Sequence, residues 1–120
     1  MRRYWLALLI LSVSTPALAT ADTCPPEGTD TGSLQLLKQQ DFTVEDAATR
    51  NTLALRLLPC LGSADPALRD GIAYEALTAW LRGNALDADT RQRLRDDLYA
   101  MLQAPDAEGF ARPFAALVLS

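Results

Sequence analysis

The chain has 120 residues, enough for one small domain, and carries 11 basic and 15 acidic residues but no histidine. The absence of histidine excludes a His-based catalytic triad and a His-containing metal site. Lysine and arginine form no consecutive run beyond Arg2 and Arg3, so neither nucleic acid nor an anionic membrane surface is an expected partner.

Residues 1–19 have the features of a removable export signal. Arg2 and Arg3 form a basic start, residues 5–13 are an apolar run, and residues 17–19 read Ala-Leu-Ala, the small-x-small pattern before a cleavage site. A membrane anchor is the alternative, but the run has about half of the roughly 20 residues that a spanning helix needs. Cleavage would leave 9 basic and 15 acidic residues. The sequence therefore predicts an acidic periplasmic or secreted protein that does not bind a membrane once the signal is removed.

The next segment, residues 20–32, contains proline, glycine, threonine and aspartate without a periodic apolar pattern, which predicts an extended arm. It carries Cys24, and the one other cysteine is Cys60. Two cysteines in an exported chain predict a disulfide, although two free thiols or pairing with another chain are alternatives. The bond would close a loop of about 37 residues and stabilise the fold by up to roughly 4 kcal/mol.

Two helices are expected after the arm, over residues 33–40 and 44–58. Thr43 is a typical N-cap for the second, and Asp46 three residues later would complete a capping box. Asn51 falls within the apolar arc of that helix. Because a buried amide needs hydrogen-bond partners, we expect it to bridge to a neighbouring turn.

The most distinctive stretch is residues 65–83. Asp65 is a typical N-cap, Pro66 suits the first helical position and Gly83 suits the end. Apolar residues cover about two-thirds of the helical wheel, more than the stripe of roughly 100° on a surface helix. The remaining narrow strip is polar and consists of Gly71, Glu75, Thr78 and Arg82. We therefore expect other helices to cover this one on two sides.

Two further helical segments follow. Asp87 is expected to cap a helix over residues 88–103, and residues 110–119 again have apolar residues at helical spacing. The solvated side of the longer helix is expected to carry Arg91, Arg93, Arg95, Asp96 and Asp97. Together, residues 33–120 predict an all-α domain of about five helices.

An offset of about 43 residues aligns Asp65 with Glu108, Arg69 with Arg112 and Ala73 with Ala116, and a period in the forties built from two helices is typical of HEAT repeats. The stretch around Asp65-Pro66 and Leu68-Arg69 resembles a HEAT unit, in which an Asp-Pro turn leads into the second helix. The resemblance implies antiparallel helix pairs stacked as a short HEAT-like solenoid. It also implies a structural polar ladder made of Asp65, Arg69, Asp70 and Arg112.

Residues 68–83 and 110–119 together also resemble a bacterial family of all-helical proteins of unknown function. Members of that family extend beyond the point at which this chain stops, so the chain would correspond to the N-terminal part of the family. Solenoids generally need three or more units for stability. We therefore expect a chain truncated at its C-terminus, or one that buries Leu117 and Val118 against a partner.

Candidate catalytic residues are few, because the sequence has no nucleophile elbow, no phosphate-binding glycine loop and no calcium loop. No cofactor or metal is expected. Asp70 stands out because the wheel places it beside Tyr74 among apolar side chains, an environment that can accompany function. A structural ion pair with Arg69 or Arg112 is the simpler explanation.

The architecture favours a module that binds another protein or a peptide through a helical face, by analogy with other helical repeats. The alternative is a small hydrolase-like enzyme in which Asp70, Tyr74, Glu75 and Arg112 converge between helices. A structure separates the two hypotheses, because catalysis requires the four side chains to meet.

Overall fold

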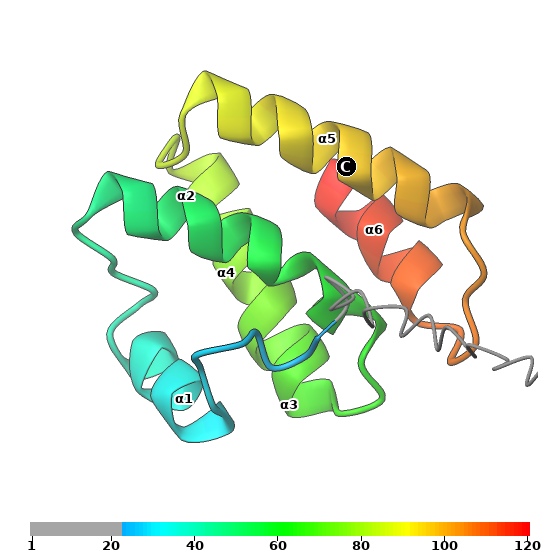
Figure 1. The fold of residues 1–120 in the computed structure, drawn as a ribbon, viewed down its shortest axis with the longest axis horizontal. Helices are drawn as coiled ribbons and strands as arrows, with labels where there is room; N and C mark the ends of the chain where they lie inside the picture. Colours follow the sequence, from blue (N-terminus) through cyan, green and yellow to red (C-terminus); the bar gives the residue numbers. More distant parts are fainter. Residues whose placement is uncertain (1–22) are drawn as a thin grey trace, which may run out of the picture.

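The computed structural model describes residues 23–120, so the predicted signal peptide at residues 1–19 lies outside the described part of the chain. The described residues form helices and turns and no strand, which confirms the all-α prediction (Figure 1). In chain order the elements are α1 (Thr31–Gln39), α2 (Ala47–Arg56), the 3₁₀ turn η1 (Leu58–Gly62), α3 (Pro66–Leu68), the π-helical segment η2 (Arg69–Tyr74), α4 (Glu75–Arg82), α5 (Ala88–Gln103) and α6 (Ala111–Leu119). Since α3, η2 and α4 are continuous, they make one helix, and the predicted number of about five is confirmed.

Aspartate side chains begin four of these helices. The carboxylates of Asp30, Asp46, Asp65 and Asp87 each accept a hydrogen bond from a backbone N–H two or three residues further on. Asp30 forms a capping box with Ser33, so α1 begins at Thr31 and the predicted arm is shorter than expected. These carboxylates also lie where the helix dipole favours negative charge.

The predicted N-cap at Thr43 is wrong, because α2 begins at Ala47 and Asp46 is its N-cap. Asp41 and Phe42 have positive φ angles of 55° and 56°, which turn the chain after α1 and leave the residues before α2 extended. Asp46 then accepts hydrogen bonds from both the N–H and the hydroxyl of Thr49, at 2.8 and 2.6 Å. An ionised carboxylate is a stronger acceptor at this position than a threonine hydroxyl.

The helix over residues 66–82 contains a wide turn that the sequence pattern did not predict. In η2 the N–H of Glu75 reaches the carbonyl of Asp70 five residues back, instead of four. Buried residues along this helix recur every four positions: Leu68 and Arg69, Ile72 and Ala73, Ala76 and Leu77, and Trp80. A regular α-helix would rotate such a stripe by about 40° per repeat. The wide turn compensates for this rotation and keeps the stripe on the core.

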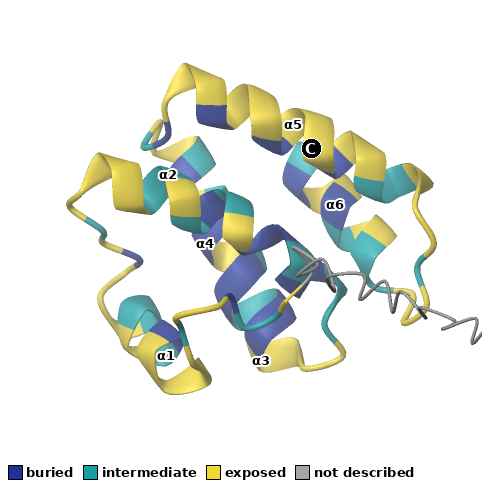
Figure 2. Ribbon diagram, in the orientation of Figure 1, coloured by how far each residue is buried: buried dark blue, intermediate teal, exposed yellow. Residues whose placement is uncertain are grey.

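Other elements cover this central helix on two sides, as expected from its wide apolar surface. Trp80 donates from its indole Nε1 to the carbonyl of Phe42 at 2.9 Å and packs edge-on against the Phe42 ring. On α6, the ring of Phe114 packs edge-on against Tyr74, with centroids 5.8 Å apart. Figure 2 shows buried residues along α3 and α4, whereas α5 is exposed along its outer side.

The predicted disulfide between Cys24 and Cys60 is confirmed, with an S–S distance of 2.05 Å. It fastens the segment before α1 to η1. Burial and a hydrogen bond also hold this segment. Pro26 is fully buried, and the Arg56 guanidinium donates to the carbonyl of Glu27.

The 3₁₀ turn η1 also lies directly against the start of α6. A Cβ atom placed on Gly62 would lie 3.2 Å from the Cβ of Ala111, tighter than nine in ten real contacts of this kind. Glycine at position 62 therefore allows η1 and the start of α6 to approach closely without a shift of either element.

Asn51 makes the bridge that was predicted for it. Its side-chain amide donates to Asp87 Oδ2 at 3.0 Å, and its Oδ1 accepts the Asp87 N–H at 3.2 Å. The contact joins α2 to the N-terminus of α5.

The predicted solvated side of α5 is confirmed, because Arg91, Arg93, Arg95, Asp96 and Asp97 are all exposed.

Within residues 23–120 we find no helix that is both long and apolar enough to cross a membrane.

The disulfide gives the first prediction. Cys24→Ser should lower the free energy of unfolding of the oxidised protein by up to roughly 4 kcal/mol, because the unfolded chain loses a crosslink between residues 36 apart. Urea unfolding followed by circular dichroism measures the change. With excess dithiothreitol the variant and the parent chain should have the same stability, and an equal loss with and without reductant would contradict the role of the bond.

Candidate functional site

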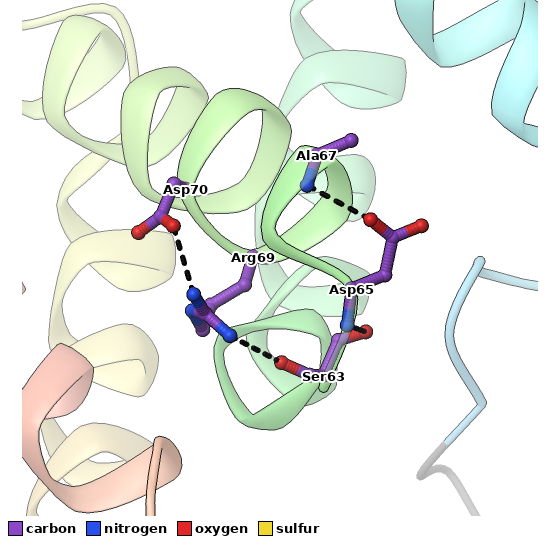
Figure 3. A network of polar contacts seen from close by, with 5 residues as sticks. All are labelled: Ser63, Asp65, Ala67, Arg69 and Asp70. Atoms are coloured by element: carbon purple, nitrogen blue, oxygen red, sulfur yellow. Dashed lines mark hydrogen bonds and ion pairs between the residues drawn. The ribbon is translucent and has the colours of Figure 1, made fainter.

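Arg69 is a buried cation at the centre of the polar network in Figure 3. Its guanidinium donates to the Ser63 carbonyl at 3.1 Å and to Asp70 Oδ2 at 3.0 Å. The carbon at the centre of the guanidinium lies 3.9 Å from the centre of the Phe110 ring and 5.2 Å from that of Phe114, both close enough for cation–π attraction. The Arg69 Nε is buried without a hydrogen-bond partner. The side chain thus joins η1, η2 and the start of α6.

The helical wheel predicted that Asp70 lies among apolar side chains, and this prediction is wrong. Its side chain is 47% exposed and pairs with Arg69. The wheel assumed regular α-helical turns, whereas the wide turn of η2 starts at Arg69 and changes the direction of the residues around it. The predicted ion pair with Arg69 is present, and an ion pair with this exposure contributes little stability.

Three residues of the predicted polar ladder, Asp65, Arg69 and Asp70, are linked through Ser63, whereas Arg112 lies outside this network. Asp65 caps the central helix by accepting from the Ala67 N–H at 2.9 Å, and its own N–H donates to the Ser63 hydroxyl (Figure 3). Arg112 lies elsewhere, with its guanidinium donating to the Ala104 carbonyl at 2.8 and 3.0 Å. The positions that the 43-residue offset aligns, Arg69 and Arg112, therefore have different surroundings.

The four residues of the enzyme hypothesis are also separated by their contacts. Asp70 pairs with Arg69, and Tyr74 packs on the Phe114 ring. Glu75 forms an ion pair with Lys38 of α1 at 3.3 Å. With the Arg112 guanidinium on the Ala104 carbonyl, no two of the four side chains share a partner, and this arrangement gives no support to catalysis by them.

Metal binding has no evident site in residues 23–120, because no three Cys, Asp or Glu residues there lie close enough together to hold an ion. Five carboxylates of this part of the chain accept backbone N–H groups at helix starts instead. One of these, Asp106, accepts hydrogen bonds from the N–H groups of Gly109, Ala111 and Arg112, at 3.1 to 3.2 Å.

A surface hollow lies where α4, α5 and the end of α6 meet. Two adjoining depressions of about 380 and 180 Å³ share the residues Leu81, Val118 and Leu119. Leu117 lines the larger one and is 48% exposed. We call the two depressions together the α4–α6 groove. Val118, for which burial against a partner was considered, is instead buried within this chain.

A third depression, of about 450 Å³, lies between the disulfide-bound segment and α2. Its walls are formed by Glu27, Gly28 and Thr29 on one side and by five residues of α2 on the other. None of the three depressions includes the residues of the enzyme hypothesis. Sequence analysis missed the α4–α6 groove, and the available signal was the apolar end of the chain beside the exposed arginines of α5.

Comparison of the chain with protein-family models, with curated proteins and with solved structures finds no match. The resemblances to HEAT repeats and to the helical family of unknown function therefore stay predictions, and functional inference rests on the geometry of the chain itself.

The Arg69 network gives a prediction about stability. Arg69→Ala should lower the free energy of unfolding by about 3 kcal/mol, because it removes a buried hydrogen bond and the contact with Phe110. Asp70→Asn should cost about 1 kcal/mol or less, because its carboxylate is half exposed. Urea unfolding of both variants measures the difference, and a larger loss in Asp70→Asn than in Arg69→Ala would show that the ion pair dominates.

Asp106 gives a prediction about pH. Hydrogen bonds to its carboxylate, first from the Arg112 N–H, lower its pKa against the opposing effect of burial. Since the folded pKa lies below the unfolded one, the stabilisation is present above about pH 4 and is lost as the pH falls through the folded pKa. Stability measured from pH 6 to pH 2 should therefore fall less in Asp106→Asn than in the parent chain. Parallel curves would contradict this assignment.

Proposed function

We propose that this protein is an exported helical module that binds another protein or a peptide through the face formed by α4, α5 and α6. The observation that carries the proposal is the α4–α6 groove, where Leu117 is half exposed beside Leu81 and Leu119. Exposed apolar surface next to a depression is typical of protein-interaction sites.

Two further features support the proposal. The candidate catalytic side chains have separate partners, so the binding hypothesis is better supported than the enzyme hypothesis. The disulfide agrees with an oxidising compartment outside the cytoplasm, as the export signal predicts.

The HEAT-like arrangement is part of the same proposal. Its support is the 43-residue offset and the packing of α5 on α6, which would form one helix pair. In such repeats the stacked helices provide an extended binding surface.

A photo-crosslinking experiment in the native host tests the proposed function. A benzophenone amino acid at position 117 should give a defined protein adduct, whereas the same group at position 36, also an exposed leucine, should not. The adduct partner, identified by mass spectrometry and purified, should bind the parent chain saturably. Leu117→Glu should weaken that binding by about tenfold or more, because it places a charge where apolar surface is buried. Equal adducts at both positions, or none at position 117, would contradict the proposal.

A further inference from the structure

We infer that the occupant of the α4–α6 groove is an acidic amphipathic segment of a partner protein, in which apolar side chains are flanked by carboxylates. This inference rests on the proposed function and specifies the chemistry of its partner. It comes from the combination of an apolar floor with a rim of arginines.

Leucines from three helices form the floor of the groove. Leu81 comes from α4, Leu94 and Leu98 from α5, and Leu119 from α6. The combined volume of the depressions suits a few side chains of a peptide, since ligand pockets generally range from about 300 to 1,000 Å³. The floor therefore supplies the apolar contact that a short amphipathic segment needs.

Three arginines line the groove. Arg82 borders the larger depression, and Arg91 and Arg95 border the smaller one. Arg91 and Arg95 are four residues apart and so lie on the same side of α5. Within residues 23–120 none of the three makes an ion pair, and Arg91 donates to the neutral side chain of Asn84 at 2.8 Å.

The acids on and next to α5 make no ion pair with the rim arginines in the described part of the chain. Asp96 accepts a hydrogen bond from the Gln92 side chain at 3.0 Å. Asp97 is exposed, and it is not spaced by three or four residues from Arg91 or Arg95, the spacing that makes side chains neighbours on a helix. Asp87, one turn before Arg91, is held by Asn51 and by the N–H of Thr90. The three rim arginines are therefore available to pair with carboxylates of a partner, although the chain as a whole has a net charge of −4.

Charge complementarity favours an acidic partner segment over a second copy of this chain. Around a twofold axis, a second copy would bring the same arginine-lined patch to both sides of the interface. Like charges at an interface disfavour association, whereas carboxylates would pair with the rim and speed the encounter. The exposed pairs would mainly provide selectivity and orientation, and the apolar floor would provide most of the affinity.

Two peptides of about 16 residues test the inference, each with leucines on one helical face and flanked by either glutamates or lysines. The probe is a fluorescent label on each peptide, and anisotropy is measured with the purified, oxidised chain. The glutamate peptide should bind, with an affinity that falls as salt rises, and the lysine peptide should bind at least about tenfold more weakly.

Variants of the rim make the test specific. The triple variant Arg82→Gln, Arg91→Gln and Arg95→Gln should weaken binding of the glutamate peptide about tenfold, if each exposed pair contributes a few tenths to one kcal/mol. Arg93→Gln is the matched control, because Arg93 is exposed on α5 and does not line the groove, and it should leave the affinity unchanged. All four side chains are exposed, and thermal unfolding should show that the variants are folded.

Equal affinity for the two peptides, no binding of either, or an unchanged affinity of the triple variant would overturn the inference. Sedimentation of the free chain tests whether a second copy occupies the groove instead. A dimer that Leu117→Glu converts to a monomer would assign the groove to a second copy and overturn the inference. If the crosslinked partner is lost on Leu117→Glu but the peptides show no charge preference, the proposed function stands and this inference fails. Loss of both results would reject both proposals.

Discussion

Arg69 connects the parts of the chain that determine where the last helix lies. A guanidinium removed from water carries a large desolvation cost, which hydrogen bonds and aromatic contact must offset. Here the Ser63 carbonyl, the Asp70 carboxylate and the ring of Phe110 surround it. These three groups come from the end of η1, from η2 and from the residue before α6. The position of α6 relative to the central helix thus depends on one buried charge.

The α4–α6 groove is a consequence of this placement. The start of α6 is held near Arg69, and Tyr74 holds Phe114 one turn later. The end of α6 then reaches α4 and α5 at Leu81 and Leu98, where Leu117 stays half exposed. Stability and the proposed binding would therefore depend on different ends of the same short helix, and changes at the two ends should be separable.

The sequence predicted the features that depend on neighbouring residues. Helix existence, the caps at Asp65 and Asp87, the disulfide and the bridge from Asn51 all follow from local patterns or from the small number of possible partners. The wide turn of η2 could not be predicted in this way, because it reconciles a four-residue stripe with the core on both sides. The direction of Asp70 was wrong for the same reason.

The candidate site was harder to predict than the fold. Arg82, Arg91 and Leu117 lie on three different helices, and each looks like an ordinary surface or terminal residue on its own. The packing of α5 on α6 brings them to one surface. The predicted active-site residues Asp70, Tyr74, Glu75 and Arg112 were neighbours on a helical wheel or aligned by the 43-residue offset. Neither criterion predicts which group a side chain contacts in the folded chain.

The contact between Gly62 and Ala111 limits how this fold can diverge. Most of the outer residues of α5 are exposed, so substitutions there should be accepted singly and in many combinations. A Cβ at position 62 would meet the Ala111 Cβ at 3.2 Å, so η1 or α6 would have to shift by a few tenths of an ångström to accept it, and a change at one position constrains the other. Larger residues at both positions would require a larger shift of the start of α6 and with it of the groove.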